Sequence, residues 1–497
     1  MNKSEILERL NLGSTVAEND DNLESYFIPT VALDDFLSDR YDLIRGAKGS
    51  GKSAILRMVT APGKVHRSLE DVILIAATEH TGEPAFKRAF EPIMLDKVTD
   101  TALTNAWKIY LLNLALDALE QLPNGVQKEA AVNFCEACGI RYRTTSAFKK
   151  IWWSVLRMLH LKNIEVGADG ISIEFPDNPP EIWMEKNDIV DFPEALRLIV
   201  DAFSKNNKRC WVLMDRLDAA FQDRPELERR ALRTLLVAYK DFMGHKALRL
   251  KLFFRTDLYD VVTSGAGFRE LTHVSDRASP PISWDPDKLM QMLMERFAFN
   301  TQVCERYGFS KSDVIDPEMR AAVFFSIFPD QIAVGKRKGD SWAWICGRIR
   351  DGNNTRTPRD LTGLVVQAAQ AERERLAGGR GLDADGLISG PAVKTGLLEL
   401  SRDKVGTTLL AENPELSDSI KMFRGKRAEQ NAATLEQLYG PRWEPIVDQM
   451  SRIGFLERLP ESWRVPTIYR GGLGIIQGAA FLKPTAAIAP DDDDDDE

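Results

Sequence analysis

The chain has 497 residues, of which 44% are apolar and five are cysteines. This length predicts roughly two to four domains, and so few cysteines exclude a disulfide framework and favour a reducing compartment. No apolar run of about 18 residues occurs and the first residues lack the apolar core of a signal peptide, so we expect a cytoplasmic protein without a membrane span.

The net charge of −9 is concentrated at one end of the chain. Seven of the 74 acidic residues lie in the run 491–497, which leaves 67 acidic against 65 basic residues elsewhere. We expect residues 486–497 to form a disordered acidic tail, because like charges repel and little can be buried. The tail is interpreted first as a solubility element and second as a mimic of DNA charge or an occupant of a basic groove. The nearly neutral body argues against a general nucleic-acid binder.

Residues 1–40 are predicted to be a lead-in that ends in a short amphipathic helix over 31–37. A strand over 41–45 and a helix over 53–59 then flank the sequence Gly-Ala-Lys-Gly-Ser-Gly-Lys-Ser. Strand, glycine-rich loop and helix is the setting of the phosphate-binding P-loop. Its glycines let backbone N–H groups approach phosphate oxygens, and the new helix directs its positive end there. The predicted nucleotide-binding residues are Gly46, Lys48, Gly49, Ser50, Gly51, Lys52 and Ser53.

Three side chains complete the predicted chemistry around Mg²⁺ and water. The hydroxyl of Ser53 is a Mg²⁺ ligand in this motif, and Asp215 follows a buried strand, where a Mg²⁺-organising acid belongs. Asp218 lies three residues further on and is predicted to orient the attacking water. The alternative is that both acids cap the following helix.

Apolar strands alternate with helices over residues 41–280, which predicts an α/β core with a parallel P-loop NTPase sheet. Arg255 directly follows the strand predicted at 250–254 and is predicted to sense or stabilise the γ-phosphate. An ion pair with Asp257 or Asp260 is the alternative. The other strands and helices of the core are expected at 72–77, 210–214, 102–119, 192–203 and 227–243.

An insertion is expected at about residues 125–190, with a helix over 148–159 and a β-hairpin that turns at Ala168-Asp169-Gly170. The pair Cys135 and Cys138 has no second pair or histidine at zinc-finger spacing, so two helical cysteines facing a core are favoured over a zinc or redox site. Mg²⁺ is therefore the only metal that we predict.

Residues 281–385 are predicted to form a helical lid, with helices at 287–297, 319–328 and 359–373. Thr357, Pro358 and Asp360 make a strong helix start. Arg359, in the first turn, is predicted to sense nucleotide, with surface ion pairing as the alternative. Arg277 is a candidate finger toward a neighbouring subunit's nucleotide. The glycine-rich segments 378–381 and 389–391 predict a flexible linker.

Residues 391–482 are predicted to form a winged-helix domain. Its helices are expected at 433–439 and 443–453, followed by strands at 455–459 and 463–466. The second helix carries Glu444 and Asp448, which would oppose contact with DNA bases. Basic side chains before and after it allow phosphate contact, so protein contact is only slightly favoured over DNA contact.

Taken in this order, the motifs resemble those of the AAA+ and STAND branch of P-loop ATPases, with origin-recognition proteins as structural relatives. The segments 46–53, 254–257, 357–361 and 468–473 are similar in detail to a bacterial group with a C-terminal winged helix that is often found in anti-phage defence loci. The resemblance implies ATP, Mg²⁺, and self-assembly or control of a protein effector. Many relatives have Asp-Glu where this chain has Asp215-Arg216, which bears on the rate of hydrolysis.

We therefore predict an ATPase whose nucleotide state controls a homo-oligomer or a protein effector, with anti-phage defence implied by the resemblance alone. One alternative is a scaffold that holds ATP without hydrolysis. A second is a DNA-associated ATPase, of the origin-recognition type or a translocating motor. A small-molecule kinase ranks last, because it leaves the winged helix without a purpose.

Overall fold

The computed structural model describes residues 1–61, 66–77, 99–138, 140–141, 163–167, 170–174, 191–217, 225–264, 271–336, 338–380 and 386–481. Its contacts divide the chain into two compact units, which we describe one at a time. The sheet unit contains Thr30–Gly46 and Lys52–Ile282, and the helical unit contains Met1–Pro29, Ala47–Gly51 and Ser283–Glu497. None of the described helices is both long and apolar enough to cross a membrane.

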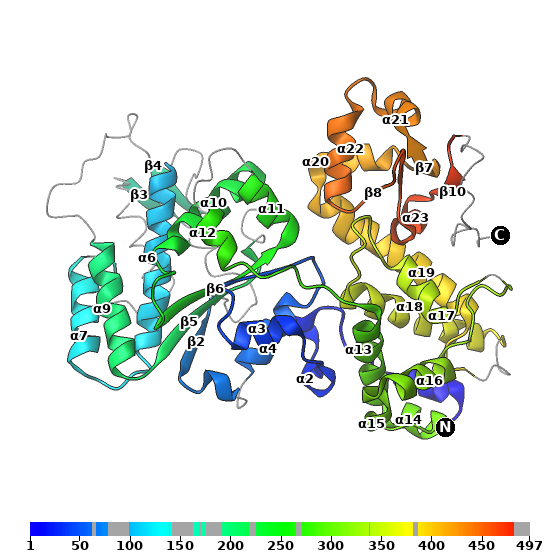
Figure 1. Cartoon of the computed structure of the whole chain (residues 1–497), viewed down its shortest axis with the longest axis horizontal. Coiled ribbons are helices and arrows are strands. Elements are labelled where there is room, and N and C mark those ends of the chain that lie inside the picture. Colours follow the sequence, from blue (N-terminus) through cyan, green and yellow to red (C-terminus); the bar gives the residue numbers. More distant parts are fainter. Residues whose placement is uncertain are drawn as a thin grey trace. The chain divides into compact units, whose positions relative to one another are not determined.

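The sheet unit is built on four parallel strands in the order β1-β6-β5-β2 (Figure 1). The strands are β1 (Leu43–Gly46), β2 (Val72–Ala76), β5 (Arg209–Met214) and β6 (Leu248–Arg255). Parallel bridges from Leu43 to Ala278 and from Gly46 to Ile282 add a further segment on the free side of β1. The predicted parallel sheet is confirmed, and its strand order fits a P-loop ATPase core.

Helices cover both faces of this sheet because its strands are apolar on both sides. In β5, Cys210, Val212 and Met214 join a core with α6 and α10, whereas Trp211 points to the other face, with its ring 5.3 Å from that of Phe36 in α3. The helices of the unit are α3 (Val31–Leu37), α4 (Lys52–Thr60), α6 (Asp100–Leu119), α7 (Val126–Ala137), α9 (Phe192–Lys205), α10 (Pro225–Lys240), α11 (Thr256–Ser264), α12 (Leu271–Asp276) and the 3-10 turn η2 (Arg67–Leu69).

The insertion contributes a hairpin of two antiparallel strands, β3 (Asn163–Gly167) and β4 (Gly170–Glu174). This confirms the predicted hairpin, since the strands meet on either side of the expected turn. The helix predicted over 148–159 lies outside the described residues.

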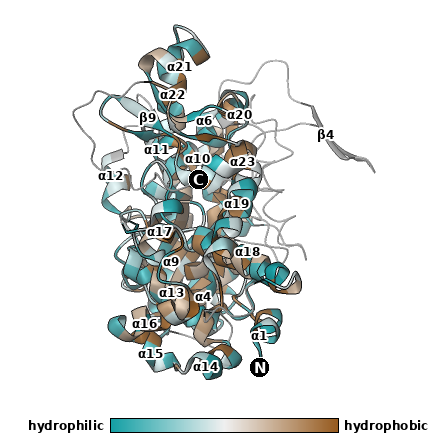
Figure 2. Ribbon diagram, turned by 90° about the vertical axis from the view of Figure 1, so that its right-hand side faces the viewer, coloured by the Kyte–Doolittle hydropathy of each residue, from teal (hydrophilic) through white to brown (hydrophobic). Residues whose placement is uncertain are grey.

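The helical unit begins with short N-terminal elements that pack with the helices after residue 283. Helices α13 and α16, which contact each other, are mostly hydrophobic in Figure 2. The helices of this part are α1 (Lys3–Arg9), η1 (Ala17–Asn19), α2 (Leu23–Tyr26), α13 (Pro286–Ala298), α14 (Thr301–Tyr307), α15 (Lys311–Ile315), α16 (Pro317–Ile327), α17 (Ser341–Arg348) and α18 (Pro358–Ala377).

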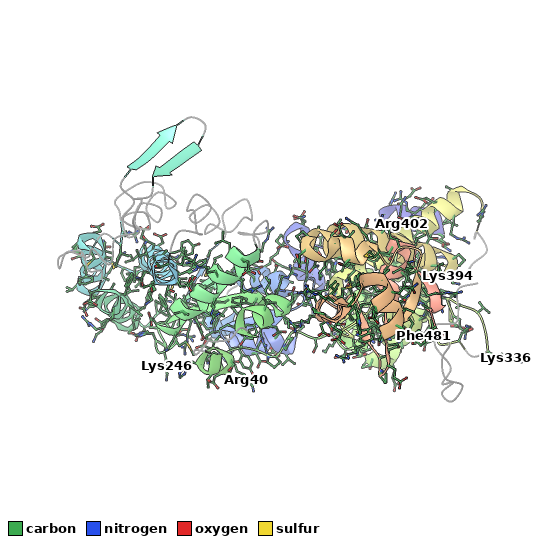
Figure 3. All side chains as sticks on the ribbon, turned by 90° about the horizontal axis from the view of Figure 1, so that it is seen from above. Arg40, Lys246, Lys336, Lys394, Arg402 and Phe481 are labelled. Atoms are coloured by element: carbon green, nitrogen blue, oxygen red, sulfur yellow. The ribbon has the colours of Figure 1, made fainter. Side chains whose placement is uncertain are left out.

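The linker predicted at residues 389–391 is wrong, because these residues begin helix α19 (Gly390–Lys404). Ser389 is the N-cap position and Pro391 lies in the first turn, where its missing N–H costs nothing. Helix α19 packs along α18 so closely that a Cβ at Gly396 would lie 2.6 Å from the backbone nitrogen of Ala368. Lys394 and Arg402 of α19 lie at the surface of the unit (Figure 3).

The C-terminal part contains a second sheet, in the order β10-β7-β9-β8. Strand β9 is antiparallel to both β7 and β8, and β10 is parallel to β7. The elements after α19 are the π-helix η5 (Val405–Leu410), α20 (Pro414–Lys421), β7 (Arg427–Asn431), α21 (Ala432–Tyr439), α22 (Trp443–Arg452), β8 (Glu457–Arg458), β9 (Ser462–Arg464), α23 (Thr467–Leu473) and β10 (Ile476–Ala479).

Candidate nucleotide-binding site

The glycine-rich loop follows β1 at Gly46 and ends where α4 begins at Lys52. Gly49 and Gly51 have φ values of +79° and +102°, a region that side chains other than glycine rarely adopt. The Nζ of Lys52 donates to the carbonyl oxygen of Gly46 across 2.7 Å, which closes the loop upon itself. This backbone turns its amides inward, as a cradle for an anion requires.

The buried hydroxyl of Ser50, within this loop, is unsatisfied in the part of the chain that the structure describes. The residue is only 1% exposed, and among the described residues its Oγ has no hydrogen-bond partner. Leaving a buried hydroxyl unpaired is unfavourable unless a ligand or water satisfies it. The loop therefore fits a phosphate group by an observation that is independent of its sequence motif.

Within the sheet unit, Ser53 and Asp215 lie together. The Oγ of Ser53 donates to Oδ2 of Asp215 across 2.6 Å, and Asp215 is 4% exposed. The first turn of α4 supplies Ser53, and Asp215 follows the last residue of β5. A hydroxyl and a carboxylate at this spacing fit Mg²⁺, which proteins commonly hold by one or two oxygen ligands together with substrate phosphates.

Arg255 lies on the strand between those of the loop and of Asp215, in register with Gly46. Its guanidinium is paired with Asp257, the pairing that sequence reasoning left open: Nη2 donates to Oδ2 across 2.6 Å and Nε donates to Oδ1 across 3.2 Å. Burial opposes ionisation of Asp257, but the charge and hydrogen bonds of Arg255, the backbone N–H of Leu258 and, last, the charge of Lys52 outweigh it and hold the pKa of this carboxyl below its usual value. Asp257 is thus within electrostatic range of Lys52, and sequence reasoning weighed it only as a partner of Arg255.

Inside the helical unit, the loop residues 47–51 are held by side chains from distant parts of the chain. The indole Nε1 of Trp284 donates to the carbonyl oxygen of Ser50 across 2.9 Å. Lys48 forms an ion pair with Glu412. Neither Trp284 nor Glu412 carries a motif that could have identified it from the sequence.

Arg359 lies directly against Gly49, since a Cβ at position 49 would be 2.7 Å from the Cβ of Arg359. Its Nε also donates to the carbonyl oxygen of Thr15 across 3.3 Å. The helix start around it is firmly held. Thr357 caps α18 through the N–H of Asp360, and Asp360 is paired with Lys404 across 2.6 Å. The predicted cap is confirmed.

Two further candidates are Asp218 and Arg277. Asp218 lies outside the described residues. Arg277, the candidate finger, donates to both carboxylate oxygens of Asp42 across 3.0 Å, and its role toward a neighbouring subunit stays a prediction. Asp42 precedes β1, whereas the loop follows β1, so Arg277 lies at the opposite edge of the sheet. Figure 3 labels Arg40 and Lys246, which precede β1 and β6 in the sheet unit.

Other metal chemistry finds little support in the part of the chain that the structure describes. No group of three or more His, Cys, Asp or Glu side chains there could hold a metal ion. Cys135 and Cys138 are free thiols, and burial raises the pKa of Cys135 to about 12. A thiol with such a pKa is protonated at neutral pH and is a poor ligand or nucleophile.

Comparison with known proteins adds a distant likeness. No protein family and no curated protein matches this chain. A Walker-type ATPase of Pyrococcus abyssi is 12% identical at a TM-score of 0.37, with 94% of this chain and 100% of that chain covered. The ORC2 protein of Aeropyrum pernix, solved as ADPNP–ADP complexes, is 12% identical at a TM-score of 0.26, with 89% and 92% covered. Likenesses this low carry no argument about function, so the assignment depends on the loop and its neighbours.

Proposed function

We propose that this protein binds ATP and Mg²⁺ at residues 46–53 and hydrolyses ATP as a switch. The observation that carries the proposal is the 2.6 Å hydrogen bond between Ser53 and Asp215. Ser53 lies in helix α4, which begins at the end of the glycine-rich loop. The unpaired, buried Oγ of Ser50 supports it independently. The bound nucleotide and its metal would supply a phosphoryl group already activated by positive charge.

The chain's own residues have separate tasks in this proposal. The loop amides and Lys52 bind the phosphates, and Lys52 would exchange its bond to the carbonyl of Gly46 for phosphate oxygens. Ser53 and Asp215 hold Mg²⁺. Asp218 orients the attacking water, a role that rests on the sequence alone. Arg255 and Arg359 read or stabilise the γ-phosphate.

The C-terminal part is proposed to be a winged-helix domain through which the nucleotide state reaches a homo-oligomer or a protein effector. The order β7-α21-α22-β8-β9, with β9 paired between β7 and β8, supports this assignment. The exposed acids Glu444 and Asp448 on α22 favour protein over DNA as its partner. A cytoplasmic role in anti-phage defence rests only on the resemblance.

A scaffold that retains ATP is the second candidate, because Arg216 follows Asp215 where many similar ATPases have glutamate. Arg216 adopts a left-handed conformation with φ of 55°, and its side chain is exposed. The chain therefore lacks an acid at this position to activate water.

Binding of ATP with and without Mg²⁺ tests the proposal on the full chain. Lys52→Ala is expected to weaken binding at least about 100-fold, the loss of a charged phosphate contact in a closed site. Lys246→Ala, which is remote and exposed, serves as the control. Unchanged ATP affinity in Lys52→Ala would overturn the proposal. Steady-state phosphate release by the unmodified chain then separates the switch from the scaffold.

A further inference from the structure

The end of β6 carries a fixed pair of opposite charges beside the phosphate-binding loop. Arg255 is the last residue of β6, and Asp257 lies in the first turn of α11. Two donors of one guanidinium meet the two oxygens of one carboxylate, at 2.6 Å and 3.2 Å. This two-point contact fixes the plane of the guanidinium as well as its position.

Asp260, the other acid considered as a partner of Arg255, is exposed and interacts electrostatically with Arg45. Burial raises the pKa of Asp260, Arg45 opposes that rise, and the charge of Asp257 adds to it. The guanidinium of Arg45 also lies 4.7 Å from the centre of the Tyr259 ring. Of the two acids, Asp257 is the one whose carboxylate is hydrogen-bonded to Arg255.

The location of the pair relates it to the outer phosphates. Arg255 is in register with Gly46, the first residue of the loop, and Lys52 is close enough to favour the ionised form of Asp257. An arginine held in one orientation loses less conformational entropy when it meets a phosphate than a freely rotating arginine does. Under the proposed function, Arg255 acts on the γ-phosphate, which only a triphosphate possesses.

We propose that Asp257 is a positioning residue that holds the guanidinium of Arg255 and thereby sets the preference for nucleoside triphosphate over diphosphate. This inference rests on the proposed function of the loop. Positioning of Arg255 can be distinguished from a purely electrostatic role of Asp257, because the loss of each would change the preference for triphosphate over diphosphate in opposite directions. Removing a negative charge alone would favour the more anionic triphosphate, whereas losing the orientation of Arg255 would disfavour it.

The test is the ratio of the dissociation constants for ADP and for the non-hydrolysable triphosphate ADPNP, both with Mg²⁺. Asp257→Asn is expected to lower this ratio about tenfold, the size expected for losing a hydrogen bond to a charged group. Arg255→Ala and Arg255→Lys should lower it similarly, since lysine keeps the charge but not the fork. The double variant Arg255→Ala with Asp257→Asn should have a ratio no lower than that of either single variant, because the two residues act as one unit.

Asp260→Asn is the matched control, because it removes a negative charge from the same helix and leaves both hydrogen bonds of the pair in place, and it should not lower the ratio. A ratio that stays constant or rises in Asp257→Asn overturns the inference while nucleotide binding itself stands. An unmodified chain that binds neither nucleotide overturns the proposed function and the inference together. If Asp257→Asn does not fold, Arg255→Lys decides, since an unchanged ratio there also overturns the inference.

Discussion

Lys48 of the glycine-rich loop is paired with Glu412, which stands between η5 and α20. The π-helix η5 ends two residues before Glu412. Such helices are rare in proteins, and those that occur are often found at functional sites. A carboxylate beside a loop that receives phosphates opposes their binding through like charge. If the loop binds phosphates as proposed, Glu412 should therefore lower its affinity for them.

We expect Glu412→Gln to raise the affinity for ATP about threefold, because the pair is partly exposed and such pairs contribute less than about 1 kcal/mol. Equilibrium titration with a fluorescent ATP analogue at low and high salt measures this, and the gain should shrink as salt increases. Glu415→Gln, on the exposed first turn of α20, is the control and should change nothing. A loss of affinity in Glu412→Gln would mean that the acid supports the loop instead.

Gly49 combines a positive φ with a close neighbour, and Gly49→Ala should therefore be costly. The left-handed conformation alone disfavours alanine by roughly 1–2 kcal/mol, and the contact with Arg359 adds overpacking of about 1–3 kcal/mol. Gly425→Ala is the matched control, because Gly425 has φ of +70° but open space around it. Urea unfolding should show the larger loss for Gly49→Ala. Equal losses would show that Arg359 yields freely.

The local parts of the site could be predicted from the sequence. The loop has an unmistakable glycine pattern, and Asp215 stands at the end of a continuous apolar strand, a position that topology alone brings to the loop. The contact between Ser53 and Asp215 follows from that reasoning, although the residues are 162 positions apart. Both residues could be placed because each lies at one end of a helix or strand whose apolar pattern is visible in the sequence.

The contacts from the helical unit could not be predicted. Glu412 and Trp284 reach the loop through tertiary packing, and neither neighbourhood has a pattern that indicates it. Strand β7 was missed for another reason: its sequence Arg-Ala-Glu-Gln-Asn has no apolar alternation, although Glu429 and Gln430 are buried in the structure. Segment 389–391 was misinterpreted because Ser-Gly-Pro is equally typical of a linker and of a helix start.

The close packing of α18 and α19 predicts that Gly396→Ala is destabilising. A Cβ there would lie 2.6 Å and 2.8 Å from backbone atoms of Ala368 and Leu364, which cannot move aside as a side chain can. We expect a loss of about 1–3 kcal/mol in the free energy of unfolding. Gly347→Ala in α17 is the control, because an added Cβ there would have no atom within 4 Å. Alanine at position 347 should increase the free energy of unfolding by as much as about 1 kcal/mol. A neutral Gly396→Ala would contradict the packing.

A buried charge network at the start of β1 makes the sheet unit sensitive to acid. Asp42 accepts hydrogen bonds from Lys251 across 2.9 Å and from Tyr239 across 2.8 Å, besides those from Arg277. Lys251 is fully buried. Burial opposes the charge of Asp42, but Lys251 and Arg277 outweigh it and lower the pKa of Asp42 from 3.8.

Because the folded pKa of Asp42 is depressed, the unfolded chain takes up this proton at a higher pH than the folded chain does. The contribution of Asp42 to stability is therefore complete above about pH 4 and is lost as the pH falls through the folded pKa. Asp42→Asn should cost about 1–3 kcal/mol at pH 7, since it removes one of the two carboxylates that the buried Lys251 contacts, Asp39 being the other, and should flatten the acid dependence below pH 4. Urea unfolding at pH 7 and in steps below pH 4 measures both effects. Asp71→Asn, which removes the surface pair with Arg209, is the control and should cost less than about 1 kcal/mol at pH 7. An Asp42→Asn chain as stable as the unmodified one would show that the network is not held by this charge.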